Sequence, residues 1–267
     1  MQINKDFSKF AKEGYIVQDL VNTLYLSTFK EFLLNKLIEI TGYKNITLEN
    51  FHEFIKNEKD KINIQFKLSE MIWKEKLHFK IIQDNIDLYY NLIGKDLDIQ
   101  MKPHLRIARP HCPEDNVGFH RDTQYGNSAY EISNFIPLVD LNENSALQIE
   151  PASHKRGTIP YSKIPSKSVK KGSIENQLGY VYEEKRIDKN FKIKPNPIPL
   201  KYKQLLIIGL GTIHGQEINT SNITRWSIDI RVKNSFSASN VKEDYYTTLS
   251  SSVVSDYARI YYKECND

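Results

Sequence analysis

A short polar motif and one distant histidine are the residues of this chain best suited to chemistry. The motif spans residues 118–122 (Gly-Phe-His-Arg-Asp), and His214 follows an apolar stretch that runs into a glycine-flanked turn. In an extended chain successive side chains point to opposite faces, so His120 and Asp122 share one face while Arg121 points away. Two histidines and one carboxylate, with open coordination positions, form the ligand set of non-haem Fe(II) oxygenases. The pattern predicts a metal site at His120, Asp122 and His214; the alternatives are an exposed polar pair and a histidine buried in the core.

A second candidate site lies on the strand predicted for residues 223–232. Four polar residues share one face of this alternating strand: Arg225, Ser227, Asp229 and Arg231. Burying a guanidinium is costly unless a carboxylate meets it with two parallel hydrogen bonds. The far carboxylate of a bound dicarboxylic acid would be such a partner for Arg225, with the Ser227 hydroxyl donating to the same group. The alternative is a salt bridge from Arg225 to an internal aspartate or glutamate.

Four further polar residues are candidates for contact with a substrate or co-substrate: Arg106, Gln124, Gln148 and His154. The first two lie on or beside the strands that bracket the metal motif. The third lies on a strand whose alternate positions face inward, and the fourth lies close to the expected mouth of the pocket. Ordinary strand polarity is the alternative for each. No catalytic side chain is expected beyond the metal ligands, and Trp226, on the opposite face of its strand, is expected in the core.

Composition limits the class of protein. The 267 residues are 40% hydrophobic and 26% charged, which suits a globular protein with a sizeable core. No stretch is long enough to span a bilayer, and the first residues lack the apolar segment of a signal peptide. Two cysteines, Cys112 and Cys265, indicate free thiols in a reducing compartment, so we expect a cytoplasmic protein. A net charge of +4 is too mild to indicate nucleic acid as a partner. We expect a small-molecule substrate and no membrane partner, and the oligomeric state is left open.

The spacing of apolar residues predicts that residues 1–96 are mainly a helical layer. Helices are expected over residues 4–13, 23–41, 47–57, 63–82 and 84–92, with a short strand at 15–17. In the second helix Leu24, Phe29, Leu33 and Leu37 form an apolar stripe, and Gly42 ends it. We expect these helices to pack against a sheet.

Residues 97–235 change character to short apolar strands separated by proline, glycine and asparagine. Strands are expected over residues 104–109, 116–124, 130–141, 145–150, 205–210 and 223–232. The polar stretch at about 151–203 reads as a long irregular lid or binding loop inserted between strands. Residues 236–267 are expected to be a tail that becomes helical toward its end. Because no repeat and no linker divides the chain, we expect one domain over residues 1–267.

Several segments together resemble the phytanoyl-CoA dioxygenase family of Fe(II)/2-oxoglutarate oxygenases. The resemblance rests on residues 14–17, 119–122, 136–141 and 146–154, followed by His214 and Arg225. It implies a mostly β fold with flanking helices: a double-stranded β-helix (jelly-roll, cupin-like) core with an N-terminal helical layer. It also implies Fe(II), 2-oxoglutarate and O2 as cofactor and co-substrates.

The same resemblance implies roles for individual residues. His120, Asp122 and His214 would be the iron ligands, and Arg225 would anchor the C5 carboxylate of 2-oxoglutarate. The family commonly has Pro-Gly-Ser-His where this chain has Pro-Ala-Ser-His at residues 151–154. Related halogenases have a small residue in place of the carboxylate, so Asp122 favours hydroxylation, with succinate and CO2 as co-products.

The polar insertion bears on the substrate. Its basic residues are His154, Lys155, Arg156, Lys163, Lys167, Lys170, Lys171, Lys185 and Arg186. Such a run is either a solvated loop or a surface that receives an anionic substrate. A small polar metabolite is therefore expected, for example a carbohydrate, a nucleotide-linked sugar or a natural-product intermediate, which would fit carbohydrate biosynthesis.

Three rival functions use the same residues differently. The fold could be a non-catalytic cupin-like module that binds a ligand or metal. It could be a metal-dependent isomerase or epimerase that works without 2-oxoglutarate. An acyl-transfer enzyme built on Cys112, near His111 and His104, is disfavoured because the sequence offers no group to orient the histidine.

Overall fold

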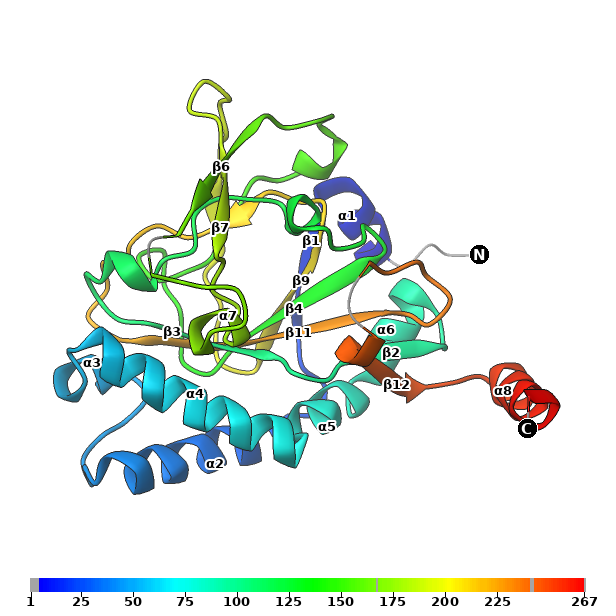
Figure 1. Cartoon of the computed structure of the whole chain (residues 1–267), viewed down its shortest axis with the longest axis horizontal. Coiled ribbons are helices and arrows are strands. Elements are labelled where there is room, and N and C mark those ends of the chain that lie inside the picture. The colour runs from blue at the N-terminus through cyan, green and yellow to red at the C-terminus, as the bar shows by residue number, and fades with distance from the viewer. Residues whose placement is uncertain (1–4, 167, 241–242, 267) are drawn as a thin grey trace.

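The computed structural model describes residues 5–166, 168–240 and 243–266. Within these ranges seven strands form an antiparallel main sheet. Its order is β1 (Tyr15–Asp19), β9 (Gln204–Gly209), β4 (Glu131–Pro137), β11 (Arg225–Asn234), β2 (Leu97–Gln100) and β12 (Tyr246–Ser250). A further strand, β3 (His104–Ala108), pairs with the first half of β11. The long strand β11 is therefore the centre of the sheet (Figure 1).

Alternation along β11 separates its two faces. Trp226, Ile228, Ile230 and Val232 are fully buried on one face. The Trp226 indole donates a hydrogen bond to the Leu48 carbonyl at 2.7 Å, and this confirms the expectation that it belongs to the core. The intervening positions, beginning with Arg225, carry the polar side chains, as the sequence predicted.

A helical layer covers the apolar face of the main sheet (Figure 1). It contains α2 (Leu24–Thr41), α3 (Phe51–Phe54), α4 (Glu58–Glu75), α5 (Leu77–Gln83) and α6 (Ile86–Ile93), while α1 (Lys5–Glu13) packs beside β1. Gly42 ends α2 in a left-handed conformation, as expected from the sequence. The side chain of Asn57 caps α4 by accepting hydrogen bonds from two backbone amides of its first turn.

Two of the expected helices were wrong in extent. The helix expected over residues 63–82 is two helices, because Lys76 adopts a left-handed conformation with φ of 52° between α4 and α5. The helix expected over 47–57 is reduced to the single turn of α3. Thr47 and Asn50 instead bond to each other's backbone amides, a local arrangement that competes with helix formation.

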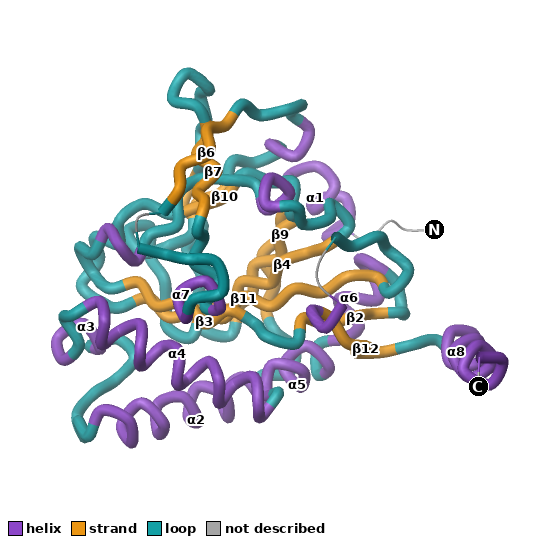
Figure 2. Tube along the Cα trace, viewed as in Figure 1, coloured by secondary structure: helices purple, strands orange, loops and turns teal. Residues whose placement is uncertain are grey.

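A small three-stranded sheet is separate from the main one, and Figure 2 labels its strand β10. It consists of β10 (His214–Gly215), β5 (Gln148–Ile149) and β8 (Asn196–Pro197). The insertion at 151–203 is more regular than expected. It contains the hairpin of β6 (Tyr161–Pro165) and β7 (Glu183–Ile187), with α7 (Ile174–Gln177) between them, and it supplies β8.

The C-terminal segment ends in α8 (Val253–Asn266), which projects from the body (Figure 1). A helix toward the end was predicted; the preceding strand β12 was not. Among the described residues no helix combines the length and apolar character that a bilayer crossing requires. Lys167, one of the predicted basic residues of the insertion, lies outside the described residues.

Candidate metal centre

The structure brings His120, Asp122 and His214 together, with one possible ligand atom of each lying within 4.8 Å of the others. Asp122 Oδ1 is 3.3 Å from Nε2 of His120 and 4.0 Å from Nε2 of His214. In each histidine Nδ1 lies close to a backbone carbonyl: that of Gly118 at 2.7 Å and that of Thr212 at 2.9 Å. Such bonds favour the tautomer with the proton on Nδ1, which leaves the Nε2 lone pairs directed at Asp122.

Backbone pairing fixes this convergence. His120 and His214 exchange two hydrogen bonds of 3.0 Å as an isolated antiparallel bridge. The strand expected over 116–124 is thus reduced to this bridge, because Asp122 begins a 3-10 helix (Asp122–Tyr125). Arg121 is nevertheless extended, and so His120 and Asp122 fall on the same side as predicted. A side chain at Gly215 would come within 2.7 Å of the Phe119 backbone, so only glycine permits this approach next to His214.

A residue that the sequence analysis did not assign, Arg231, also contacts the metal site. Its Nη2 donates to Asp122 Oδ2 at 3.0 Å. Burial disfavours the ionised form of Asp122, but Arg231 and the two imidazoles outweigh it and hold the pKa of the carboxyl well below its usual range. Burial, followed by the neighbouring His120, lowers the pKa of His214. At neutral pH Asp122 is therefore ionised and the His214 imidazole is neutral, which are the forms in which these two groups bind a divalent metal.

The polar face of the main sheet forms the floor of a cavity at this site. Register explains its lining, because Ser227 pairs with Arg106, and Asp229 pairs with His104. The cavity is lined by Gln100, His104, Arg106, Val117, His120, Asp122, Ser133, Phe135, Leu147, Ile208, His214, Gly215, Gln216, Arg225, Asp229 and Arg231. We call it the inner cavity.

Arg225 lies in the inner cavity and has no ionic partner among the described residues. Its side chain is 4% exposed, and its Nε is buried without a hydrogen-bond partner. The hydroxyl of Ser227, fully buried two positions along, is also without a partner. Burial lowers the pKa of Arg225 to about 10, so the guanidinium is still charged at neutral pH. The predicted alternative, a salt bridge from Arg225 to an internal carboxylate, is not found within the described part of the chain.

The lining of the inner cavity contains one more arginine than it has aspartates. Arg106 bonds to Asp229 at 3.0 Å, and Arg231 bonds to Asp122 at the same distance. Two of the three arginines in the lining are therefore neutralised by the two aspartates, and Arg225 remains. A buried and unpaired guanidinium is costly, and a bound carboxylate would offset that cost.

Of the four other residues predicted to line the pocket, one lines the inner cavity and three lie outside it. Arg106 lines the inner cavity, where Asp229 already holds it. Gln124 instead caps the 3-10 helix that begins at Asp122, by accepting a hydrogen bond from the Arg121 amide at 3.0 Å. Gln148 and His154 also lie outside the lining. Gln148 pairs with Gly215 in the small sheet, and His154 Nε2 is 3.1 Å from the Ala11 carbonyl beside α1.

His104 lines the inner cavity although the sequence analysis gave it no role there. Burial lowers its pKa well below the ordinary value, so its ring is neutral. It does not belong to the cluster of possible metal ligands. The signal that could have placed it was alternation along β3, since His104 and Arg106 are two positions apart.

A second, larger cavity of about 1040 Å³ shares Val117 and His120 with the inner one. We call it the outer cavity. One wall is the start of α4, and another is the insertion, including parts of β6 and β7 and the loop around α7. The insertion therefore forms part of the wall of a cavity that reaches His120, and its role as a lid or binding loop stays a prediction.

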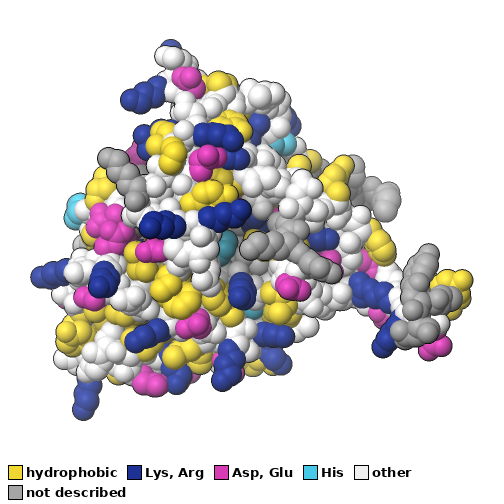
Figure 3. Space-filling view, viewed as in Figure 1, with side chains coloured by type: hydrophobic (Ala, Val, Ile, Leu, Met, Phe, Trp, Pro, Cys, Tyr) yellow, Lys and Arg dark blue, Asp and Glu magenta, His cyan; other side chains and the backbone are white. Residues whose placement is uncertain are grey.

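The charged side chains that line the outer cavity are mixed in sign: Glu58, Lys59, Glu114, Glu175, Glu184, Lys185 and Arg186. Of the basic residues that were expected to receive an anion and that the structure describes, only Lys185 and Arg186 are among them. Arg186 pairs with Glu184 at 2.8 Å, and the Lys185 ammonium donates to the Gln124 carbonyl. Basic and acidic side chains are likewise intermixed over the face of the molecule that Figure 3 shows.

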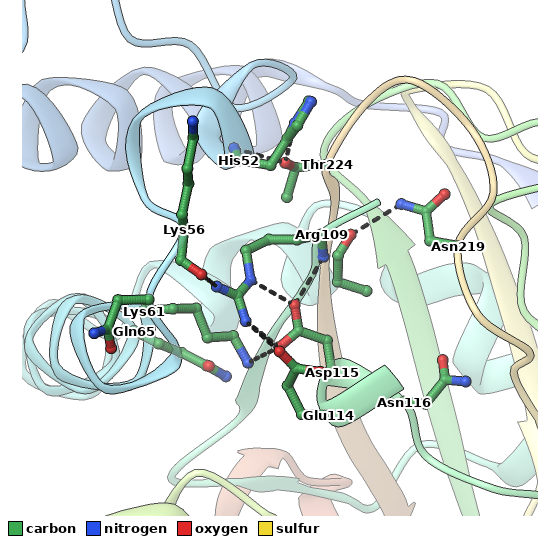
Figure 4. Close-up of polar contacts among 12 residues, drawn as sticks. His52, Lys56, Lys61, Gln65, Arg109, Glu114, Asp115, Asn116, Asn219 and Thr224 are labelled. Atoms are coloured by element: carbon green, nitrogen blue, oxygen red, sulfur yellow. Dashed lines mark hydrogen bonds and ion pairs between the residues drawn. The ribbon is translucent and has the colours of Figure 1, made fainter. Parts of the chain in front are cut away.

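A buried ionic network holds the segment between β3 and the metal motif (Figure 4). Asp115 accepts hydrogen bonds from the Arg109 guanidinium at 2.8 and 3.2 Å and lies 3.0 Å from the ammonium of Lys61 on α4. Arg109 also donates to the Lys56 carbonyl at 2.7 Å, and Lys61 donates to the hydroxyl of Tyr180. Because Tyr180 lines the outer cavity, the network joins the helical layer to the insertion.

Solved structures share this fold. The non-heme monooxygenase ThoJ has a TM-score of 0.56 at 14% identity, covering 93% of this chain and 84% of its own. EvdO2 from Micromonospora carbonacea var. aurantiaca has a TM-score of 0.55 at 13% identity, covering 92% and 95%. The non-heme alpha ketoglutarate dependent carbocyclase SnoK from nogalamycin biosynthesis has a TM-score of 0.52 at 12% identity, covering 87% and 85%. One ThoJ structure is a nickel complex, and one EvdO2 structure is a complex with 2-oxoglutarate.

At such low identity these likenesses establish the fold alone. The mostly β fold with a double-stranded β-helix core and flanking helices, predicted from the sequence, is confirmed. No protein-family model and no curated protein matches the chain. The resemblance to the phytanoyl-CoA dioxygenase family therefore stays a prediction.

Proposed function

We propose that this protein is a non-haem Fe(II)- and 2-oxoglutarate-dependent dioxygenase that hydroxylates a small polar metabolite. One observation carries the proposal: an open metal-ligand set and an unpaired, buried guanidinium face the same cavity. A site for the metal alone would not need Arg225. A site for a dicarboxylic acid alone would not need two imidazoles directed at an ionised carboxylate.

The residues present fit both groups. His120, Asp122 and His214 would hold Fe(II), while Arg225 and Ser227 would bind the far carboxylate of 2-oxoglutarate through groups that otherwise lack partners. When bound, iron with 2-oxoglutarate and dioxygen supplies the oxidising power, and the co-substrate leaves as succinate and CO2. The side chains position the reactants and keep water from the site; none of them carries out the oxidation.

The outer cavity is the proposed binding site for the substrate. His120 lines both cavities, so a molecule in the outer one would lie next to the metal. The mixed charges and apolar side chains of the lining favour a polar and partly apolar molecule without a large net charge. Carbohydrates and natural-product intermediates suit this lining better than a strongly anionic nucleotide-linked sugar. The wider idea of carbohydrate biosynthesis stays a proposal.

Two alternatives use the same site. An oxidation other than hydroxylation would need the same metal and co-substrate, and the neighbour SnoK is described as a carbocyclase. A non-catalytic or isomerase-type cupin-like protein would need no 2-oxoglutarate, which leaves Arg225 without a reason to be buried and unpaired. Acyl transfer is disfavoured, because burial raises the pKa of the Cys112 thiol and so suppresses its nucleophilic form.

The test is anaerobic titration of the protein with Fe(II) and 2-oxoglutarate. A weak visible charge-transfer band is expected from the chelate, followed by slow succinate formation when oxygen is admitted. His120→Ala and Asp122→Ala should abolish the band and succinate formation, because each removes a metal ligand. Binding of Fe(II) without 2-oxoglutarate would favour the isomerase reading, and full succinate formation by either variant would refute the proposal.

A further inference from the structure

We infer that Arg231 is a positioning residue of the metal centre, which holds one oxygen of Asp122 so that only the other oxygen faces the metal. The inference rests on the proposed function insofar as it requires a metal at His120, Asp122 and His214. It concerns a contact that the ligand residues alone do not specify.

The two oxygens of Asp122 have different partners. Oδ1 faces the imidazoles, at 3.3 Å from His120 Nε2 and 4.0 Å from His214 Nε2. Oδ2 accepts a hydrogen bond from Arg231 Nη2 at 3.0 Å. Oδ1 is therefore the oxygen that would bind a metal, while Oδ2 is bound by Arg231.

Arg231 is itself held in place from three directions. Its other terminal nitrogen, Nη1, donates to Oδ1 of Asn127. Asn127 in turn donates from Nδ2 to the backbone carbonyl of Asp122 at 3.0 Å. The backbone amide of Arg231 donates to Oε1 of Gln100 at 3.1 Å. Arg231, Asn127 and Asp122 thus form a closed ring of contacts that holds the guanidinium against Oδ2 of Asp122.

The guanidinium is needed for this geometry. It is planar and offers donors in a fixed fork, so that one terminal nitrogen can hold Asp122 while the other holds Asn127. A lysine in the same place would keep the charge but could not serve both acceptors in fixed directions. Partners that orient a ligand in this way commonly change metal affinity about 10- to 100-fold when they are removed.

A carboxylate held at one oxygen has a consequence for chemistry. If both oxygens of Asp122 were free, both could occupy coordination positions of one ion. With a metal bound, Arg231 would hold Oδ2 and would leave Oδ1 as the oxygen available to the ion. A purely structural role would be to neutralise a buried aspartate, and such a role would affect stability without affecting how the metal is bound.

The experiment measures Co(II) binding to metal-free protein, without 2-oxoglutarate or substrate, by calorimetry and by the visible absorption of bound Co(II). Arg231→Lys keeps the charge and should weaken Co(II) binding about 10- to 100-fold. Its Co(II) spectrum should change, because Asp122 is free to bind through both oxygens. Asn127→Ala leaves Arg231 in place but removes its second partner, so a smaller change in the same direction is expected; it also serves if Arg231→Lys fails to fold.

Arg106→Lys is the matched control. Arg106 pairs with Asp229 at the same 3.0 Å in the same cavity, but Asp229 is not one of the possible ligands. This variant should retain the affinity and the spectrum of the unaltered protein.

Two results would overturn the inference. If Arg231→Lys and Asn127→Ala fold and match the unaltered protein in affinity and spectrum, while Asp122→Ala loses binding, Arg231 has only a structural role and the proposed function stands. If Asp122→Ala binds Co(II) as the unaltered protein does, the metal site itself is wrong, and the proposed function fails with it.

Discussion

Replacing Arg225 with methionine should make the protein more stable and at the same time impair binding of 2-oxoglutarate. Methionine keeps much of the apolar volume of the arginine stem and removes the charge. Burial lowers the pKa of Arg225 from its ordinary value to about 10. A pKa shift of one unit corresponds to about 1.4 kcal/mol, so the charged side chain lowers the free energy of unfolding of the protein without bound 2-oxoglutarate by about 3 kcal/mol.

The size of both effects follows from this burial. Removing the charge should raise the free energy of unfolding by up to about 3 kcal/mol, which corresponds to roughly 2–4 °C in melting temperature for each kcal/mol. Loss of the charge-assisted hydrogen bonds to the C5 carboxylate should cost about 1.5–3 kcal/mol of binding. The dissociation constant for 2-oxoglutarate should therefore rise about 10- to 150-fold.

Two assays test the expected gain in stability and the expected loss of 2-oxoglutarate affinity separately. Thermal melts of the metal-free protein report stability, and anaerobic calorimetry of the Fe(II)-loaded protein reports 2-oxoglutarate affinity. Arg225→Lys should show weaker binding without the gain in stability. Arg106→Met is the opposite control, since it leaves Asp229 without its cation and should lower the melting temperature. An Arg225→Met protein that is less stable and binds 2-oxoglutarate normally would show that Arg225 serves the fold and would refute the anchoring role.

Three further predictions concern the rest of the chain. Asp115→Ala removes the carboxylate shared by two buried cations, which takes the ion pair from Lys61 and leaves Arg109 with Glu114 at 3.5 Å, and it should lower the free energy of unfolding in urea by about 3–5 kcal/mol. Lys61→Met should cost less because the carboxylate keeps its arginine, and equal costs would contradict this account of the network. Burial lowers the pKa of His78 from 6.5 to about 4. Between these two pH values the unfolded chain binds more protons than the folded one. The free energy of unfolding should therefore fall by about 3 kcal/mol as the pH drops from 6.5 to about 4. A His78→Asn variant should lack this contribution, and an unchanged pH slope would count against it. Because Lys170 and Lys171 lie outside the outer cavity's lining, changing both to glutamine should leave substrate-dependent succinate formation unchanged, and a large loss would restore the anionic-substrate hypothesis.

The side of the chain on which each site residue lies could be predicted from the sequence. Alternation along a strand placed His120 and Asp122 on one side of the chain, and it placed Arg225 and Ser227 on the polar face of β11, because side-chain direction in an extended segment depends only on position. The expected strand around His120 was too long, but two extended residues are enough for the argument. The order of helical and strand-like segments predicted a helical layer followed by a sheet, whereas the double-stranded β-helix core was implied by the resemblance to the phytanoyl-CoA dioxygenase family.

Partners across strands could not be predicted in the same way. Arg231 was recognised as sharing a face with Arg225, but its contact with Asp122 depends on how the chain folds between β4 and the metal motif. The alternation of side chains along a strand does not predict which of the three arginines in the inner cavity lacks a carboxylate partner. That depends on the strand register, which places Arg106 opposite Ser227 and within reach of Asp229. For the same reason Gln124 and Gln148 looked equivalent to Arg106 in the sequence, although the structure uses Gln124 in a cap and Gln148 in the small sheet.

The inner cavity also explains why so many charged residues are tolerated at the centre of the main sheet. Two of its arginines are each matched to an aspartate, so their burial is compensated inside the protein. The third, Arg225, is the first residue of β11, and its guanidinium lies 5.7 Å from the centre of the Phe135 ring. Its Nε and the Ser227 hydroxyl have no hydrogen-bond partner among the described residues. Had Arg225 evolved only to support the fold, an apolar residue would do so at lower cost. Within the described part of the chain, this uncompensated charge in the cavity lining supports the proposal that a ligand carboxylate binds at Arg225, where the Ser227 hydroxyl is a second donor without a partner.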